Sequence, residues 1–244
     1  MRTIRFFHVT DGMAEAYPVV EARKHRFEWY KTMAEEVRRS KASVEYVPAA
    51  SKCPAIIDIN TTGYFVPLDR DIYVNNKHGR LEAKNASPKF YQITEQVVHP
   101  AKDYLDERSA MPFVLKVAAG WHCICPPELR FYLGPIPYPD NTLWYTLPGL
   151  YTPRQDFQIN FQGLWNTTEN GHKLKAGTPM VHLVPLTNEK FRMSVGPATP
   201  TERYIASALQ TMAASTKPIP SKLMQRLYMI YASKIKKEWK DYEI

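Results

Sequence analysis

The 244-residue chain contains little cysteine, little glycine and no long hydrophobic stretch. Three cysteines are too few, and odd in number, for a disulfide framework, and are typical of free thiols in a reducing compartment. Ten glycines against twenty prolines predict short elements joined by stiff turns. No apolar run approaches the ~18–20 residues of a membrane span, and the N-terminal MRTIRFFHVTDG lacks the apolar core of a secretory signal. We therefore expect a globular protein without a membrane span, not secreted through a signal peptide.

The net charge of +8 is concentrated at the two ends of the chain. Residues 20–41 carry +3 and residues 217–244 carry +4, residues 1–19 are balanced, and the other 175 residues carry +1. A nucleic-acid enzyme more often has its basic residues along a central cleft. Basic helices at the ends indicate contact with nucleic acid, a membrane surface or an acidic partner, or else solvated helix faces.

The order of hydrophobic patterns predicts the fold class. Residues 20–40 have helical spacing, with Phe27, Tyr30, Ala34 and Val37 on one stripe. From Cys53 to about Val195, short apolar or alternating runs between turn residues favour antiparallel strands. These runs lie at 55–59, 63–68, 71–74, 112–118, 143–147, 157–161 and 180–186.

Helical spacing returns after residue 198. Thr199-Pro200-Thr201-Glu202 has the order of a capping box, and an apolar stripe follows it. A last helix over 221–240 has a second stripe opposite a basic face. That stripe consists of Leu223, Leu227, Tyr231, Ile235 and Trp239.

These patterns predict a β-rich α+β protein with a central antiparallel β-domain, flanked by an N-terminal helix and two C-terminal helices. We expect three segments along the chain. They are an N-terminal strand and basic amphipathic helix (1–52), the central β-domain (53–197) and a C-terminal helical segment (198–244).

The motifs of common metal sites and catalytic centres are missing, so we predict no catalytic residues, no metal site and no cofactor. No H-x-D, H-E-x-x-H, G-x-S-x-G, P-loop or G-x-G-x-x-G occurs. The one dense cluster, Trp121-His-Cys-Ile-Cys125, is predicted to be a strand with both cysteines on the face of Trp121 and with His122 on the other face. Because one C-x-C lacks the paired spacing of zinc sites, Cys123 and Cys125 are expected to be free, buried thiols.

The clearest alternating segment is Asp156-Phe-Gln-Ile-Asn-Phe161. Its apolar residues face the core, which leaves Asp156, Gln158, Asn160 and Gln162 on the opposite face. That polar face is a solvated surface, a subunit interface or the wall of a ligand site. The ligand-binding candidates are Arg154, Asp156, Gln158 and Asn160.

Three segments carry a resemblance: CPAIIDINTTGYFVPLDRDIYV, LPGLYTPRQDFQINFQGLWN and LKAGTPMVHLVPL. Over residues 53–186 the pattern resembles a family of uncharacterised phage and bacterial proteins. More distantly, the turn at Gly149, the alternating strand and the segment from Lys175 to Leu183 are similar to the β-clip fold of dUTPase and dCTP deaminase. The catalytic Asp of that fold would stand at Thr152, and its Arg-Ser-Ser loop is missing, so the resemblance implies the fold without the pyrophosphatase activity.

The leading function hypothesis is a non-enzymatic phage protein that acts through protein–protein contacts, as a virion structural or accessory component. The alternatives are a nucleotide-binding or nucleotide-hydrolysing β-clip protein and a host-interaction factor. The expected partners are further copies of the chain in a homo-oligomer such as a trimer, other phage proteins, and weakly bound nucleic acid at the basic helices. The expected location is the virion or the host cytoplasm.

The C-terminal helix is the predicted partner-contact element, through Leu227, Tyr231 and Trp239. A lone helix of this length is marginal in water, so its apolar stripe requires a cover. The β-domain of the same chain, a neighbouring subunit or other protein, and a membrane surface or nucleic acid all stay open as that cover.

Overall fold

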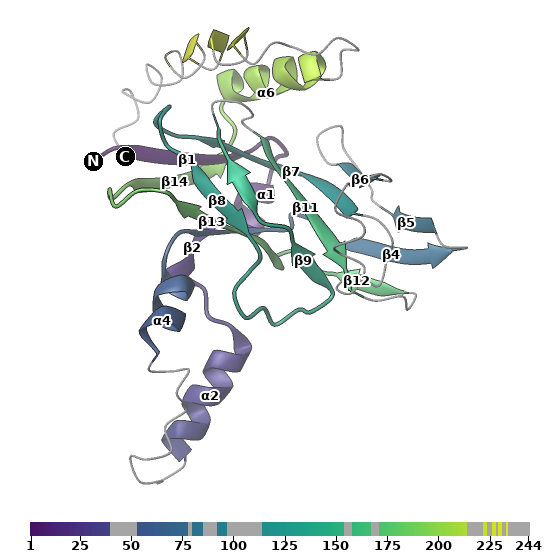
Figure 1. Cartoon of the computed structure of the whole chain (residues 1–244). Helices are drawn as coiled ribbons and strands as arrows, with labels where there is room; N and C mark the ends of the chain where they lie inside the picture. Colours follow the sequence, from purple (N-terminus) through teal and green to yellow (C-terminus); the bar gives the residue numbers. More distant parts are fainter. Residues whose placement is uncertain are drawn as a thin grey trace.

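The computed structural model describes residues 1–39, 53–77, 80–84, 92–96, 114–153, 158–166 and 171–213, with helical positions 222, 223, 226, 227, 229, 230 and 233. The fold is β-rich α+β with three sheets, as the sequence predicts (Figure 1). None of the helices described is long and apolar enough to span a bilayer.

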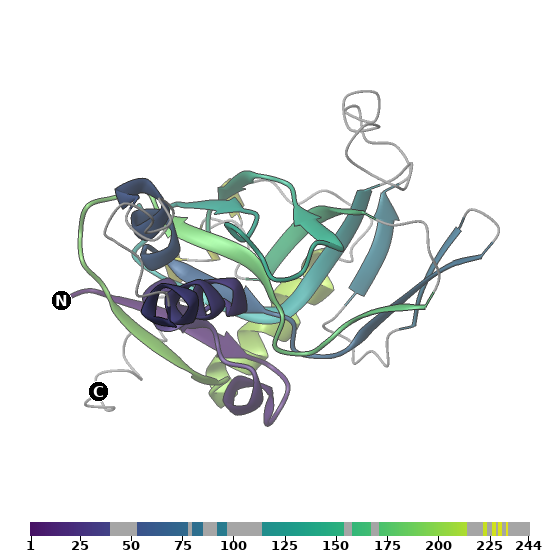
Figure 2. The same ribbon diagram turned by 90° about the horizontal axis from the view of Figure 1, so that it is seen from below.

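Three sheets contain the described strands. The largest has the order β14 (Arg192–Pro197), β1 (Thr3–His8), β7 (Val114–Ile124), β11 (Gln158–Trp165) and β9 (Trp144–Thr146), and β6 (Gln92–Gln96) also pairs with β7. The second has the order β10 (Gly149–Tyr151), β8 (Phe131–Gly134), β13 (Pro179–Pro185), β3 (Tyr64–Pro67) and β2 (Val20–Glu21). The third consists of β12 (His172–Leu174), β4 (Ile72–Lys77) and β5 (Arg80–Lys84), and lies away from the N-terminus in both views (Figures 1 and 2).

Among the strands that the structure describes, only β1 and β14 pair in parallel, and the other pairs are antiparallel. Because β1 lies between β14 and β7, and β2 pairs with β3, residues on both sides of the expected 52/53 boundary form the same two sheets. Strands β3, β4, β7, β9, β11 and β13 coincide with predicted apolar runs.

The main core lies between the two larger sheets. Phe6, Trp121 and Ile159 from the six-stranded sheet and Val66, Phe131 and Leu183 from the five-stranded sheet belong to one buried cluster. Cys123 and Cys125 belong to this cluster as well, whereas Ile124 belongs to the cluster on the other face of β7. The alternation predicted for this segment is therefore confirmed.

Helix α6 (Pro200–Ala213) covers the outer face of the six-stranded sheet (Figure 1). The predicted capping box is present, since the Thr199 amide donates to Glu202 Oε2 at 2.8 Å and the Glu202 amide donates to Thr199 Oγ1 at 3.2 Å. Glu202 also accepts from Arg5 of β1, at 3.2 Å from its Nε. Ile205 and Ala206 then pack with Phe7, so the helix start is fixed to the sheet by both polar and apolar contacts.

Helix α2 (Glu28–Arg39) begins eight residues later than the start predicted at residue 20. The preceding residues form β2 and the 3₁₀ turn η1 (Ala22–Lys24), because Val20 and Glu21 pair with β3. The Asp140 carboxylate accepts from the Glu28 amide at 3.1 Å and so caps the helix. Phe27 packs with Phe65 on the outer face of the five-stranded sheet, and α2 projects on the side opposite α6 (Figure 1).

The strand predicted at 55–59 is wrong, since Pro54–Thr61 form helix α4. Pro54 occupies the first turn, where its fixed φ suits a helix and its missing amide hydrogen is not needed. A short apolar run does not distinguish strand from helix by periodicity. No residue of α4 is buried, and Ile57 and Ile59 are exposed.

A further short helix, α1 (Met13–Ala16), follows β1.

Candidate functional site

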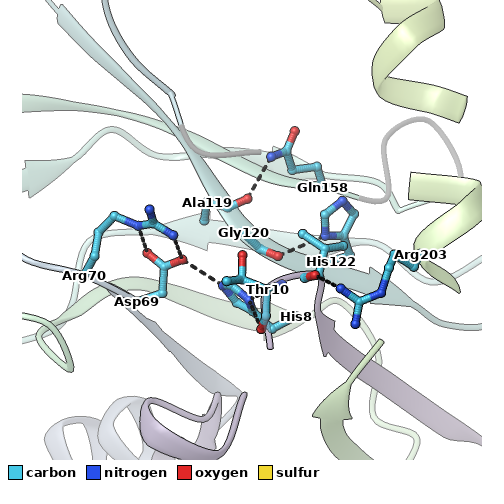
Figure 3. A network of polar contacts seen from close by, with 10 residues as sticks. His8, Thr10, Asp69, Arg70, Ala119, Gly120, His122, Gln158 and Arg203 are labelled. Carbon is cyan, nitrogen blue, oxygen red and sulfur yellow. Dashed lines mark hydrogen bonds and ion pairs between the residues drawn. The ribbon is translucent and has the colours of Figure 1, made fainter. Parts of the chain in front are cut away.

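A cluster of buried polar side chains lies where the two larger sheets meet (Figure 3). His8 ends β1, and Asp69 follows β3 in the other sheet. Their side chains are buried, with His8 Nε2 and Asp69 Oδ2 2.8 Å apart. Arg70 holds both carboxylate oxygens of Asp69, with Nε–Oδ1 and Nη2–Oδ2 distances of 3.0 Å. The three side chains therefore connect one sheet to the other.

The hydrogen bonds of His8 engage both ring nitrogens. Nδ1 accepts from the Thr10 amide at 3.0 Å and lies 3.2 Å from the Thr10 carbonyl, while Nε2 is hydrogen-bonded to Asp69. Burial opposes ionisation of Asp69, but the hydrogen bonds from His8 and Arg70 outweigh it and keep the pKa of this carboxyl below its ordinary value. The pair is an imidazole hydrogen-bonded to an ionised carboxylate.

Gly120 of β7 makes room for this pair. A methyl group at its Cα would lie 2.4 Å from His8 Nε2 and 3.0 Å from Asp69 Oδ2. The indole of the next residue, Trp121, meets the His8 ring edge-on with the ring centres 5.1 Å apart. The site is close-packed on this side, and any larger residue at position 120 displaces His8.

His122 lies on the opposite face of β7 from Trp121. Its ring stacks on Phe7 at 5.1 Å, and its Nδ1 donates to the Gly120 carbonyl at 3.1 Å (Figure 3). Burial lowers the pKa of His122 to about 3, because the imidazolium form would have no water around it. His182 of β13 is bound in the same way, to the Thr62 carbonyl at 2.6 Å, and burial lowers its pKa.

This arrangement suits a structural role for the histidines. Both ring nitrogens of His8 are engaged inside the protein, and the His8 side chain is fully buried. A general base must reach the proton it removes, directly or through one water. His8 and Asp69 carry no signal in the sequence, because neither residue stands in a motif and they are 61 positions apart.

The predicted site residues divide between the described chain and the remainder. Gln158 donates from Nε2 to the Ala119 carbonyl at 2.8 Å, and Asn160 follows it on the same half-buried face of β11 (Figure 3 shows Gln158). Arg154 and Asp156 lie outside the described residues, as do Tyr231 and Trp239. Leu227 is helical and half-buried.

The cysteines at positions 123 and 125 are buried and form no disulfide, as expected. Burial raises the pKa of Cys123 far above its ordinary value, and the neighbouring Cys125 thiol adds to this shift. Within the residues that the structure describes, no three His, Cys, Asp or Glu side chains gather as metal ligands would.

The outer face of the five-stranded sheet carries an apolar row. Leu150 of β10 pairs with Tyr132 of β8, which pairs with Val184 of β13, so the three side chains project on one side. Leu186 follows Val184 along the chain. Leu150 is 64% exposed and Leu186 49% exposed, and Tyr132 lies over Gly134. We call Leu150, Tyr132, Val184 and Leu186 the apolar row.

No protein-family model, curated protein or solved structure matches the chain.

Proposed function

We propose that this chain is a non-enzymatic phage protein that acts through protein–protein contacts, as a virion structural or accessory component. The observation that carries the proposal is the apolar row. It runs across three strands of a rigid sheet and exposes apolar side chains to water, whereas the ionisable groups at the junction of the sheets are buried and paired. Contiguous exposed apolar surface of this kind is typical of a contact site.

The structure favours contact through the sheet face over contact through the sheet edge. Strand β10 is the edge, but it has only three residues and stands between Pro148 and Pro153. Short edges flanked by proline resist the addition of another strand. The face offers more, because burial of a leucine as exposed as Leu150 contributes up to about 1.5–3 kcal/mol. The proposed partner at the apolar row is a second copy of the chain.

The test is the mass of the purified protein by analytical ultracentrifugation over a range of concentrations. The wild type is expected to self-associate, and Leu150→Lys to shift the equilibrium to monomer. Tyr204→Lys is the matched control, since Tyr204 is 71% exposed on α6, on a different sheet, and its substitution should leave the association unchanged. A wild type that stays monomeric at all concentrations would remove self-association through the apolar row.

The phage assignment is supported by the resemblance over residues 53–186 and is tested separately. Mass spectrometry of purified virions from the source phage should detect the chain at a fixed number of copies per particle. Its detection only in infected host cells would replace the virion component with the host-interaction factor.

A further inference from the structure

The C-terminal segment presents an apolar stripe without cover from the described part of the chain. Leu223 and Ile230 are helical and 45% and 51% exposed, and Leu227 between them is half-buried. At about 100° per residue, these three side chains lie within an arc of about 60°. Figure 1 places the described positions of this segment beside α6, remote from α2.

Basic side chains border this stripe. Lys222 and Arg226 are exposed and, at the same rotation per residue, occupy the sector next to it. The sequence from Ser221 to Lys237 contains five Lys or Arg and no Asp or Glu. The same stretch and its continuation to residue 240 supply Tyr228, Tyr231 and Trp239, residue types that favour the headgroup region of a bilayer.

We propose that the C-terminal helix binds the surface of an anionic membrane, lying in its plane with Leu223, Leu227 and Ile230 toward the acyl chains. The charge pattern argues against a second copy as the cover, because two such helices would place like charges side by side. Nucleic acid would engage the basic residues but gives no role to the apolar stripe. An anionic bilayer would contact both parts of the helix. The apolar side chains would insert among the acyl chains, and Lys222 and Arg226 would be attracted to the anionic headgroups.

Helix α6, which precedes the segment in the sequence, is held against the six-stranded sheet. Helix α6 is fixed to the sheet through the Arg5–Glu202 pair and through Ile205, while its outer residue Tyr204 is exposed. The helical positions from Lys222 onward follow this helix in the sequence, after its end at Ala213. This inference is independent of the proposed virion role and of the apolar row.

The experiment is co-sedimentation of the full-length protein with vesicles of phosphatidylcholine alone or with a third of phosphatidylglycerol. Binding is expected to the anionic vesicles only, and to fall at 0.5 M salt. Ile230→Glu should weaken it at least about tenfold, because a charge would enter the apolar region. Lys222→Glu with Arg226→Glu should weaken it to a similar degree. Tyr204→Glu is the matched control and should bind like the wild type.

Thermal unfolding of each variant checks that it is folded, and position 230 is exposed enough for the substitution to leave the midpoint unchanged. Failure of the wild type to bind anionic vesicles would overturn the proposal. So would binding that survives Ile230→Glu, which would assign the interaction to charge alone. Binding to DNA but not to vesicles, lost in the double charge reversal, would assign the helix to nucleic acid instead.

Discussion

Acidification from pH 7 to pH 5 is expected to destabilise the protein, and part of the loss in free energy of unfolding should come from protonation of His122 in the unfolded chain. The ring is 3% exposed and burial lowers its pKa from 6.5 to about 3. Between these values the unfolded chain binds a proton that the folded chain excludes. The stability is therefore fully present above pH 6.5 and is lost as the pH falls below it.

The magnitude follows from the pH interval. Each pH unit between 6.5 and 3 removes about 1.4 kcal/mol, so at pH 5 the contribution of His122 is a loss of about 2 kcal/mol. The lowered pKa values of His25 and His182 act in the same direction. The pKa of Asp69 is lowered because hydrogen bonds stabilise its charged form. The contribution of Asp69 to stability is therefore lost only as the pH falls below the ordinary value of 3.8. Histidines therefore dominate the change in stability between pH 7 and pH 5.

The assay is urea unfolding at pH 7 and pH 5, for the wild type and for His122→Phe, which keeps the stack on Phe7 and removes the titration. The variant loses the hydrogen bond to the Gly120 carbonyl at both pH values, so only the difference between the two is compared. Repetition at 0.5 M salt removes the general repulsion of a chain with net charge +8. An equal pH dependence in the wild type and in His122→Phe would refute the reasoning.

Three further predictions concern Asp69, the three cysteines and Thr152. Asp69→Ala should lower the free energy of unfolding by about 3–5 kcal/mol in urea titrations, because it removes the buried carboxylate that pairs with His8 and Arg70, and a loss below 1 kcal/mol would contradict the buried pairing. A thiol reagent such as DTNB should label the half-exposed Cys53 in the native protein and reach Cys123 and Cys125 only on unfolding, and three rapid equivalents would show that the strand end is open. The purified protein is expected not to hydrolyse dUTP or dCTP, since a threonine hydroxyl at position 152 does not serve as a general base near neutral pH, and turnover abolished by Asp156→Ala would identify a different base.

Local features were predicted correctly from the sequence because the residues that form them are a few positions apart. The capping box joins Thr199 to Glu202 within one turn, and both of its hydrogen bonds form as expected. The two faces of β7 follow from a period of two residues, which places Cys123 with the core and Ile124 under α6. Ile159 and Phe161 are buried for the same reason, leaving Gln158 and Asn160 on the half-buried face.

Contacts between distant segments could not be obtained in this way. Residues 55–59 have the composition of a buried strand, yet no neighbouring strand pairs with them and Pro54 starts a helix. Val20 and Glu21 lie in a helical pattern of the sequence, but they pair with β3 and form an edge strand of its sheet. In both places the tertiary environment decided between two conformations that the local sequence permits.

The sequence by itself determined the β-rich class, the start of α6 and the inward faces of the central strands, because these depend on spacing along the chain. Only the tertiary structure decided three contacts. His8 is hydrogen-bonded to Asp69, Gly120 leaves space for that pair, and Leu150, Tyr132 and Val184 share one face of a sheet. Each contact depends on the register between strands far apart in the chain. That register is set by the packing of the whole core, and no short stretch of sequence contains it.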